Sequence, residues 1–407
     1  MRNLILIILI ICFGFTSYSQ QDKIEQLQND VNYLASDELK GRETGTEGEK
    51  LAASYIIGEF EKIGVEPKGS DGYNQSFDIT PKANPHQNEG EFTGEPIKVT
   101  NVIGYIDNGA EKTVVIGAHY DHLGLGGEGS LHAGEDEIHN GADDNASGVA
   151  IMLQLARDLV KENEPKQNFL FIAFSGEEKG LWGSNYYCKN PTIDLSTVNF
   201  MINMDMVGRL DSDKGLAING VGTSPAWERV LTTTSLNEAK LVTSESGVGP
   251  SDHTSFYLKD IPVLHFFTGQ HSDYHKPSDD IDLINFEGMA RINEYILEII
   301  NYLGEEEKIA FTKTKDESED TPRFTVTLGV MPDYMFQGDG MRIDGVTEGK
   351  PASKAGFEAG DVVIKMGDIE VTDMMSYMKA LSEFKKGDKT TVIVKRGKKK
   401  IKEKVTF

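Results

Sequence analysis

The sequence is poor in cysteine and short of positive charge. Its 407 residues include only two cysteines, so neither a disulfide framework nor a cysteine-rich zinc module can form. Lysine and arginine number 41 against 65 aspartates and glutamates, which gives a formal net charge of −24. A chain this acidic has no long-range attraction for phosphate groups or anionic lipid. Nucleic acid is therefore excluded as an expected partner.

The apolar run near the start of the sequence is too short to span a membrane. It extends from Leu4 to Phe15, whereas a spanning helix needs about 20 residues. Arg2 precedes the run, and the small residues Ser17 and Ser19 follow it, which is the pattern of a secretory signal peptide. We predict a signal peptide over residues 1–19 and export to the periplasm, the cell surface or the medium. No stable membrane insertion is expected after cleavage.

Between residues 24 and 304 the sequence alternates between strand-like and helix-like segments. Four short apolar runs are typical of strands buried on both faces of a largely parallel sheet: 113–118, 168–174, 198–204 and 261–267. Apolar residues at helical spacing predict helices over 148–161 and 286–303. The alternation predicts an α/β fold with a mixed, mostly parallel sheet flanked by helices.

The composition changes after residue 304. Residues 305–322 are polar and mostly charged, with little to bury, and we interpret them as an acidic linker. Residues 323–407 contain 16 basic and 12 acidic residues, a net charge of +4. This change of sign supports a domain boundary. We therefore predict a larger domain over 20–304 and a small, β-rich domain over 323–407.

Histidines and acidic residues follow the predicted strands at the points where the strands end. They are His119, Asp121 and His122 after the first strand, Glu177 and Glu178 after the second, Asp205 after the third, and His271, Asp273 and His275 in the loop after the fourth, together with Asp143 and Asp144 just before a predicted helix. In an open α/β sheet, ligands bind outside the carboxyl ends of the strands. Imidazoles and carboxylates brought to that edge suit zinc or a similar divalent ion. The sequence therefore predicts a metal site there.

Taken singly, these residues have ordinary explanations. Two adjacent glutamates favour the start of a solvated helix, because carboxylates are stabilised at a helix N-terminus. A calcium loop beginning at Asp143 would need a bidentate glutamate at its twelfth position, where Gln154 stands. Asp205 is harder to explain as a surface residue, because it follows an apolar stretch and a buried carboxylate is costly unless it is paired or binds metal.

Six motifs resemble, in order, those of the zinc aminopeptidases of the M28 metallopeptidase family. They are GAHYDHLG (117–124), HNGADDNASG (139–148), FSGEEKGLWGS (174–184), NMDMVG (203–208), SDHTSF (251–256) and YHKPSDD (274–280). The segment ASDELKGRETGTEGEKLAASYI (35–56) is also similar to that family's opening segment. The resemblance extends from about residue 24 to residue 304.

The resemblance implies a centre with two zinc ions, for which cobalt or manganese could substitute. It assigns five ligands: His119 and Asp205 on one ion, Glu178 and His275 on the other, and Asp143 as the bridge. Glu177 would be the general base for a water activated by the two ions. Asp121 would orient His119, Asp144 would support the site without binding metal, and the peptide bond between Asp143 and Asp144 would be cis. Since these ligands fill both ions, the other motif histidines are not expected to bind metal: His122, His132, His139 and His253.

The C-terminal segment resembles bacterial PDZ domains. The resemblance rests on GVTEGKPASKAGFEAGDVVIKMGDIEV (345–371). It implies that Leu328, Gly329 and Val330 form the loop that holds the terminal carboxylate of a bound peptide, which then adds as a strand to the sheet. A peptide or protein C-terminus is the partner implied for this domain.

Three functions follow from these observations. The first is an exported di-zinc aminopeptidase acting on peptides with a free N-terminus. The second is a glutaminyl-cyclase-like aminoacyltransferase, which uses a related scaffold with one zinc, so that the full ligand set argues against it. The third is a non-catalytic peptide-binding protein, against which the retained Glu177 argues.

Overall fold

The structure is a computed structural model that describes most of the chain. The described residues are 20–80, 95–127, 129–132, 134–162, 166–236, 239–304, 306–314, 326–333, 336, 338–347 and 349–407. The predicted signal peptide and residues 305 and 315–322 of the predicted linker lie outside them. The chain divides into two compact units: residues 1–129, 136–268 and 277–313 form the first, and residues 130–135, 269–276 and 314–407 form the second.

The first unit is built on a nine-stranded sheet with the order β1-β3-β5-β4-β6-β9-β7-β8, in which β2 also pairs with β3. The strands are β1 (Glu66–Pro67), β2 (Asn74–Ile79), β3 (Ile97–Ile106), β4 (Thr113–His119), β5 (Asn168–Phe174), β6 (Val198–Met204), β7 (Leu216–Asn219), β8 (Leu241–Ser244) and β9 (Val263–Phe267). The central strands β5, β4, β6 and β9 are parallel. Antiparallel pairs flank them, β3 with β5 on one side and β7 with β9 on the other.

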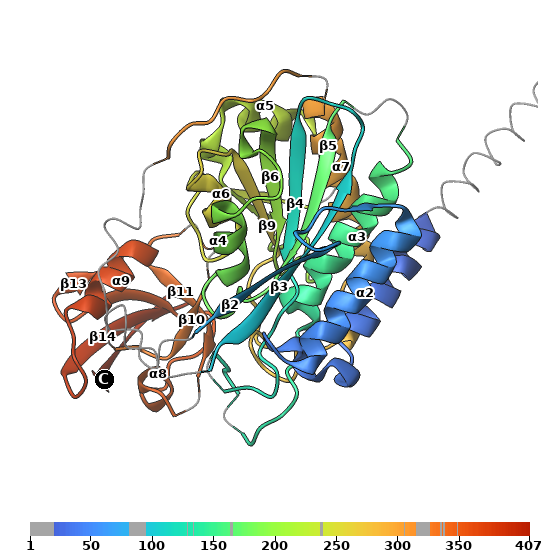
Figure 1. Ribbon diagram of the computed structural model, residues 1–407. Coiled ribbons are helices and arrows are strands. Elements are labelled where there is room, and N and C mark those ends of the chain that lie inside the picture. Colours follow the sequence, from blue (N-terminus) through green and yellow to red (C-terminus); the bar gives the residue numbers. More distant parts are fainter. Residues whose placement is uncertain are drawn as a thin grey trace, which may run out of the picture. The chain divides into compact units, whose positions relative to one another are not determined.

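Helices cover both faces of this sheet (Figure 1). After a helical segment over residues 20–34 come η1 (Asp37–Arg42), α2 (Glu47–Ile63), η2 (Ala142–Ser147), α3 (Gly148–Leu159), α4 (Trp182–Lys189), η3 (Leu195–Thr197), η4 (Val221–Thr223), α5 (Pro225–Thr233), α6 (His253–Tyr257), η5 (Ile281–Leu283) and α7 (Phe286–Gly304). In Figure 1, α2 and α3 lie on one side of the sheet and α4 and α6 on the other.

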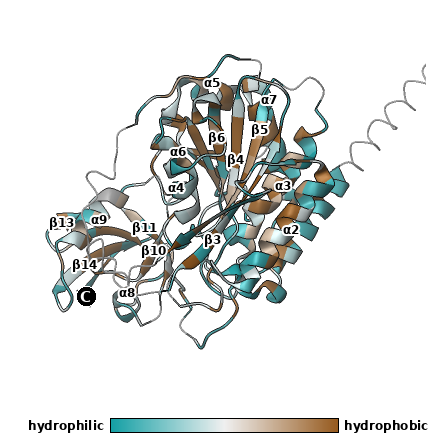
Figure 2. Cartoon of the chain, viewed as in Figure 1, coloured by the Kyte–Doolittle hydropathy of each residue, from teal (hydrophilic) through white to brown (hydrophobic). Residues whose placement is uncertain are grey.

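The alternation of side chains along the strands produces two apolar cores, one on each face. In β4, Val114 and Ile116 join the core that includes α2, α3 and α7, whereas Val115 packs with residues of α4 and α6. Strands β4, β5 and β6 are buried along their whole length, and Figure 2 shows their hydrophobic colouring. The predicted α/β fold, with a mixed sheet flanked by helices, is confirmed, and its parallel strands occupy the centre.

The second unit contains an antiparallel sheet with the order β10-β11-β12-β14-β15, in which β13 pairs with β12. Its elements are β10 (Val330–Pro332), β11 (Met341–Val346), α8 (Pro351–Lys354), β12 (Val362–Met366), β13 (Ile369–Glu370), α9 (Met374–Ser382), β14 (Lys389–Arg396) and β15 (Lys399–Thr406). Its core draws on both helices and the sheet, through Ala352, Tyr377 and Val394 among others. The predicted small, β-rich fold is confirmed. Within the described residues, none of the helices combines the length and the apolar character that crossing a membrane requires.

Candidate metal centre

Three neighbouring parallel strands deliver the residues of the candidate site to one edge of the sheet. His119 is the last residue of β4, and Asp205 follows β6 directly. Glu177 and Glu178 lie a few residues beyond the end of β5. Because β5, β4 and β6 are adjacent and parallel, their carboxyl ends meet, as the sequence pattern predicted.

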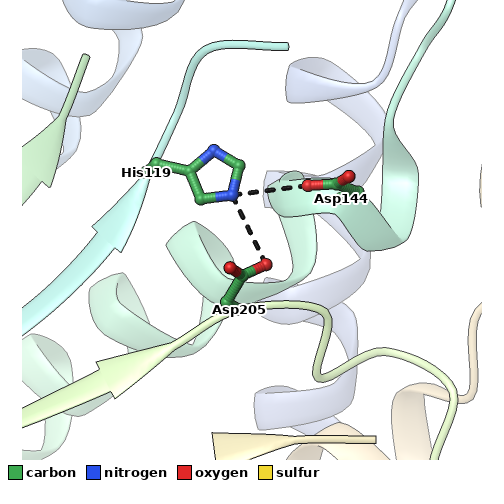
Figure 3. Close-up of side chains that lie close together, drawn as sticks. All are labelled: His119, Asp144 and Asp205. Atoms are coloured by element: carbon green, nitrogen blue, oxygen red, sulfur yellow. Dashed lines mark hydrogen bonds and ion pairs between the residues drawn. The ribbon is translucent and has the colours of Figure 1, made fainter. Parts of the chain in front are cut away.

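The first cluster of metal-ligand type joins His119, Asp144 and Asp205 (Figure 3). The Nε2 atom of His119 lies 3.3 Å from Oδ1 of Asp144 and 3.4 Å from Oδ1 of Asp205. His119 and Asp144 are buried, with 1% and 3% of their surface exposed. An imidazole nitrogen and two carboxylate oxygens therefore converge on one small volume that is largely closed to water.

The second cluster joins His122, Asp144 and Glu178. The Nδ1 atom of His122 lies 2.8 Å from Oε1 of Glu178 and 3.9 Å from Oδ2 of Asp144. Asp144 thus has one carboxylate oxygen in each cluster. A carboxylate in this position has the geometry of a bridge between two cation sites.

The structure differs from the prediction at Asp143 and Asp144. Asp143 lies in neither cluster found among the described residues. Its Oδ1 atom accepts hydrogen bonds from the Gly208 amide, at 2.6 Å, and from the Ser147 hydroxyl, at 3.1 Å, so this oxygen is already engaged by the protein. The cis peptide bond likewise joins Asp144 to Asn145, one residue later than expected. Two consecutive aspartates offer no sequence signal to separate their roles.

His122 also departs from expectation, because it was not among the predicted ligands and lies in the second cluster. His275 belongs to the segment 269–276, which groups with the second unit. There its ring stacks on Tyr274, with 3.8 Å between the ring centroids, and its carbonyl accepts a hydrogen bond from the Leu131 amide. The structure therefore brings four predicted site residues together with His122, and the role of His275 stays a prediction.

Asp121 lies on the opposite side of the His119 ring from the cluster. Its carbonyl oxygen is 3.2 Å and its Oδ1 atom 3.7 Å from Nδ1 of His119. The carboxylate is held in turn by the Glu177 amide, at 3.1 Å, and by the Thr44 hydroxyl, at 2.9 Å. A polar partner on Nδ1 fixes the orientation of the ring and leaves Nε2 facing the carboxylates. Sequence reasoning missed Thr44, although its motif, GRETGTEG, is rich in polar residues and glycine.

The electrostatics of the site reflect an excess of carboxylates. Burial alone would lower the pKa of His119, but the carboxylates of Asp205 and Glu177 outweigh it and raise the pKa well above its usual value. Burial raises the pKa of Glu177 well above the ordinary range, although His119 opposes the shift. Asp252, fully buried nearby, has its pKa raised to about 7, chiefly by burial. The raised pKa values of Glu177 and Asp252 reflect the cost of negative charge where water is scarce, a cost that a bound cation would offset.

The predicted carboxylate-binding loop of the second unit adopts a turn. Gly329 has a φ of 73°, a conformation that glycine adopts without strain. The carbonyl of Leu328 accepts from the Ala352 amide, and that of Gly329 accepts from the Thr347 amide. The Gly329 amide donates to the Thr327 hydroxyl at 3.0 Å, so that one donor expected to face a ligand has a partner within the chain.

Comparison with curated proteins links the chain to metallopeptidases. A probable zinc metalloprotease from Pyrenophora teres f. teres is 25% identical over 301 residues, which covers 62% of this chain and 59% of the relative. An aminopeptidase from Bacillus subtilis is 27% identical over 246 residues, covering 58% of this chain and 49% of the relative. The chain thus spans about 59% of the length of the first curated relatives that it matches.

Solved structures show the same fold. A zinc aminopeptidase from Bacillus subtilis superimposes with a TM-score of 0.55 and 19% identity, covering 72% of this chain and 98% of that one. A glutaminyl cyclase from Porphyromonas gingivalis gives a TM-score of 0.53 and 17% identity, covering 70% and 98%. The model of peptidase family M28 matches residues 101–300, and the PDZ domain model matches residues 309–406. The chain is thus similar to peptidase family M28 over residues 101–300 and to PDZ domains over residues 309–406.

Proposed function

We propose that this chain is an exported zinc-dependent aminopeptidase that removes N-terminal residues from peptides. The observation that carries the proposal is the carboxylate of Asp144, which has one oxygen in each of two histidine–carboxylate clusters. Two metal sites a few ångströms apart are a recurrent arrangement in aminopeptidases. The M28 domain and the relatives named zinc metalloprotease and aminopeptidase support the same function.

The donor set fits zinc, because imidazole nitrogens and carboxylate oxygens are its usual ligands beside cysteine. We assign His119 and Asp205 to one ion and Glu178 to the other. Asp144 is assigned as the bridge, in place of Asp143. This assignment follows the distances in the two clusters.

The second imidazole of the centre has two candidates. His275 remains the proposed ligand beside Glu178, on the strength of the motif YHKPSDD. His122 lies within hydrogen-bond distance of Glu178, and we assign it to hold that carboxylate in one orientation. A variant with His275→Asn is expected to lose one zinc ion per chain, whereas His122→Asn weakens binding without changing the stoichiometry. The opposite pattern would exchange the two roles.

Bound zinc would supply the positive charge that activates a water and polarises the scissile carbonyl. Glu177 is the proposed proton carrier: its carboxylate takes a proton from the attacking water and delivers it to the leaving amine nitrogen. Burial raises the pKa of Glu177, which strengthens this carboxylate as a proton acceptor. Its amide donates to Asp121, which fixes the backbone at this position.

The substrate is proposed to be a peptide with a free N-terminus. The site concentrates the carboxylates of Asp144, Glu177, Glu178 and Asp205 at the end of the sheet. A positively charged terminal amine is complementary to such a surface, whereas an acetylated terminus is not. This complementarity supports exopeptidase activity from the N-terminal end.

The decisive experiment offers the zinc-loaded protein a mixture of free and N-acetylated peptides and identifies the products by mass spectrometry. Stepwise loss of N-terminal residues from the free peptides alone is the expected result, with Glu177→Gln as the inactive control. Loss of ammonia from peptides that begin with glutamine would assign the chain to the glutaminyl cyclases instead. An unchanged mixture would contradict the enzyme proposal and favour a non-catalytic peptide-binding protein.

The PDZ domain is proposed to bind a peptide or protein C-terminus at Leu328, Gly329 and Val330. Backbone amides of such a loop bind a carboxylate, and the adjoining strand β10 pairs with the peptide. Fluorescence anisotropy should detect peptides with a free C-terminus and fail to detect the same peptides as C-terminal amides. Equal binding of both forms would contradict the assignment.

Export is proposed from the N-terminal pattern alone. N-terminal sequencing of the protein recovered from an expressing bacterium should begin at Gln20, after removal of residues 1–19. Recovery of the protein with Met1 retained would contradict this part of the proposal.

A further inference from the structure

The loop that carries Asp144 is held between a buried cation and a buried anion. We propose that Arg42 and Asp279 are positioning residues, which clamp residues 140–144 and so fix Asp144 between the two clusters. The inference rests on the proposed function, because it assigns these residues a role toward the metal centre. Neither residue belongs to the proposed ligand set, and neither is the proposed proton carrier.

All three guanidinium nitrogens of Arg42 donate to main-chain carbonyls. It donates to the carbonyls of Asn140 at 2.7 Å, Gly141 at 3.1 Å and Tyr120 at 2.9 Å, and also to that of Leu34. The side chain is 1% exposed. Over the described part of the chain, no carboxylate forms an ion pair with it. A buried cation is ordinarily paired with an anion, so its use on carbonyls alone needs an explanation.

Asp279 makes the complementary contacts with the amides of the same loop. Its Oδ2 atom accepts hydrogen bonds from the amides of Asp143 and Asp144, both at 3.0 Å. Its own carbonyl accepts from the Ala142 amide at 3.1 Å, and its Oδ1 atom accepts from Arg209 at 3.3 Å. Asp279 is fully buried.

The contacts of Arg42 and Asp279 account for every residue of the loop. The carbonyls of Asn140 and Gly141 bind the cation, and the next three amides bind Asp279. A side chain at Gly141 would not fit, because its Cβ atom would lie 2.1 Å from the Asp144 carbonyl oxygen and 2.6 Å from the His122 ring. The positively charged Arg42 thus binds carbonyls at the start of the loop, and the negatively charged Asp279 binds amides at its end.

Arg42 also links this loop to the strand that ends at His119. Its bond to the Tyr120 carbonyl falls between His119 and Asp121, and the Arg42 carbonyl accepts from the His122 amide. One side chain therefore fixes the separation between the β4 end and the Asp144 loop. Lysine cannot replace it, because its ammonium lacks the planar fork that reaches several carbonyls at once.

Charge at neutral pH does not distinguish arginine from lysine here. Burial lowers the pKa of Arg42 to about 10, while Asp144, Asp121 and Asp279 oppose the shift. Arg42 stays positively charged at pH 7. A difference in zinc affinity between the wild type and Arg42→Lys therefore reflects the geometry of the hydrogen bonds and not a loss of charge. A purely structural role would instead predict a loss of stability with unchanged metal affinity.

The matched control is a second, partly buried arginine. Arg157 bonds to Asp30 and Glu59, through α3 and the helices packed on it, and it has no contact with either cluster in the described structure. Arg157→Lys therefore removes a guanidinium with several hydrogen bonds from a part of the structure that holds none of the proposed metal ligands.

The test measures zinc affinity and stability separately. Wild type, Arg42→Lys and Arg157→Lys are titrated with zinc against a chromophoric chelator, and their free energies of unfolding are measured in EDTA. Arg42→Lys is expected to bind zinc about 10–100-fold more weakly, as is usual when a residue that orients metal ligands is lost. Arg157→Lys should lose stability and keep its zinc affinity within about twofold of the wild type.

Unchanged zinc affinity in folded Arg42→Lys, or an equal loss in Arg157→Lys, would overturn the inference and leave the proposed function intact. If Arg42→Lys fails to fold, Asp279→Asn decides the matter, because it is expected to weaken zinc binding about 10-fold from the other end of the loop. Unchanged affinity in that variant would also overturn the inference. A wild-type protein that binds no zinc would overturn the proposed function itself.

Discussion

The two sheets of the chain handle charged side chains in opposite ways. The nine-stranded sheet gathers acidic residues at the ends of β4, β5 and β6, where they are buried or partly buried and close to one another. The antiparallel sheet carries its lysines along the exposed edge strand β15, at Lys400, Lys402 and Lys404. Buried like charges cost free energy and need a cation, whereas exposed lysines cost little and discourage edge-to-edge pairing. Charged side chains therefore have two different roles in this chain: the carboxylates at the strand ends form a candidate binding site, and the exposed lysines of β15 keep the edge strand solvated.

The largest expected effect is at Glu177. Glu177→Gln preserves the shape of the side chain and removes its ability to carry a proton, so kcat should fall about 10²–10⁴-fold. Zinc stoichiometry, measured by metal analysis of the dialysed protein, should stay the same as in the wild type. Retained turnover would remove Glu177 from the mechanism and weaken the contrast between the two sheets.

The next effect separates the two adjacent aspartates. Asp144→Asn should weaken zinc binding by about 100-fold or more, because the carboxylate common to both clusters loses its charge. Asp143→Asn should keep its zinc affinity close to the wild-type value and lose stability, because Asp143 accepts from Gly208 and Ser147. Chelator competition and urea unfolding measure the two quantities. The reverse order would restore Asp143 as the bridge.

A pH effect is expected at Glu49, beside the site. Burial, reinforced by Asp121, raises the pKa of this carboxyl to about 8 in the folded protein, while its value in the unfolded chain is near 4.5. The folded state binds the proton more tightly, so stability falls as pH rises from about 5 to about 8, by a few kcal/mol at about 1.4 kcal/mol per unit.

Glu49→Gln isolates this contribution. The amide can accept from the Gly45 amide and donate to the Ser175 hydroxyl, where Glu49 now bonds. Urea unfolding of the variant in EDTA should therefore show a weaker decline of stability between pH 5 and pH 8 than the wild type. Parallel curves for the two proteins would contradict the shift.

The smallest effect is expected on the edge of the second sheet. Lys402→Gln removes one exposed charge from β15 and should change the free energy of unfolding by less than about 0.5 kcal/mol. Thermal unfolding of the two proteins under matched salt measures the difference. A loss above about 1 kcal/mol would mean that these lysines stabilise the sheet, which contradicts the expectation that their charge costs and contributes little.

The sequence predicted the sheet and its polar edge because both depend on patterns along the chain. Runs such as 113–118 must be buried on both faces, and the residues that follow them must lie at one edge. Asp205, which follows an apolar run, signalled its role for the same reason. These inferences need no knowledge of how distant segments pack.

The remainder of the site could not be predicted because it depends on packing between distant segments. The order of Asp143 and Asp144 in the sequence does not indicate which carboxylate lies in the clusters. In the structure, the Gly208 amide and the Ser147 hydroxyl donate to the carboxylate of Asp143. In the sequence, nothing distinguishes Arg42 from an ordinary surface arginine. Its contacts with the carbonyls of residues 140 and 141, almost a hundred positions away, form only in the folded chain.

In the two-metal centre proposed above, the shared carboxylate of Asp144 would make the two metal sites thermodynamically interdependent. An ion in one cluster alters the charge and the orientation of the carboxylate that the other must use. The affinity of each site therefore depends on the occupancy of the other, and the free energy of this coupling is the same in both directions. Metal binding to such a centre is described by two linked equilibria, so a substitution at either cluster changes the metal affinity of both.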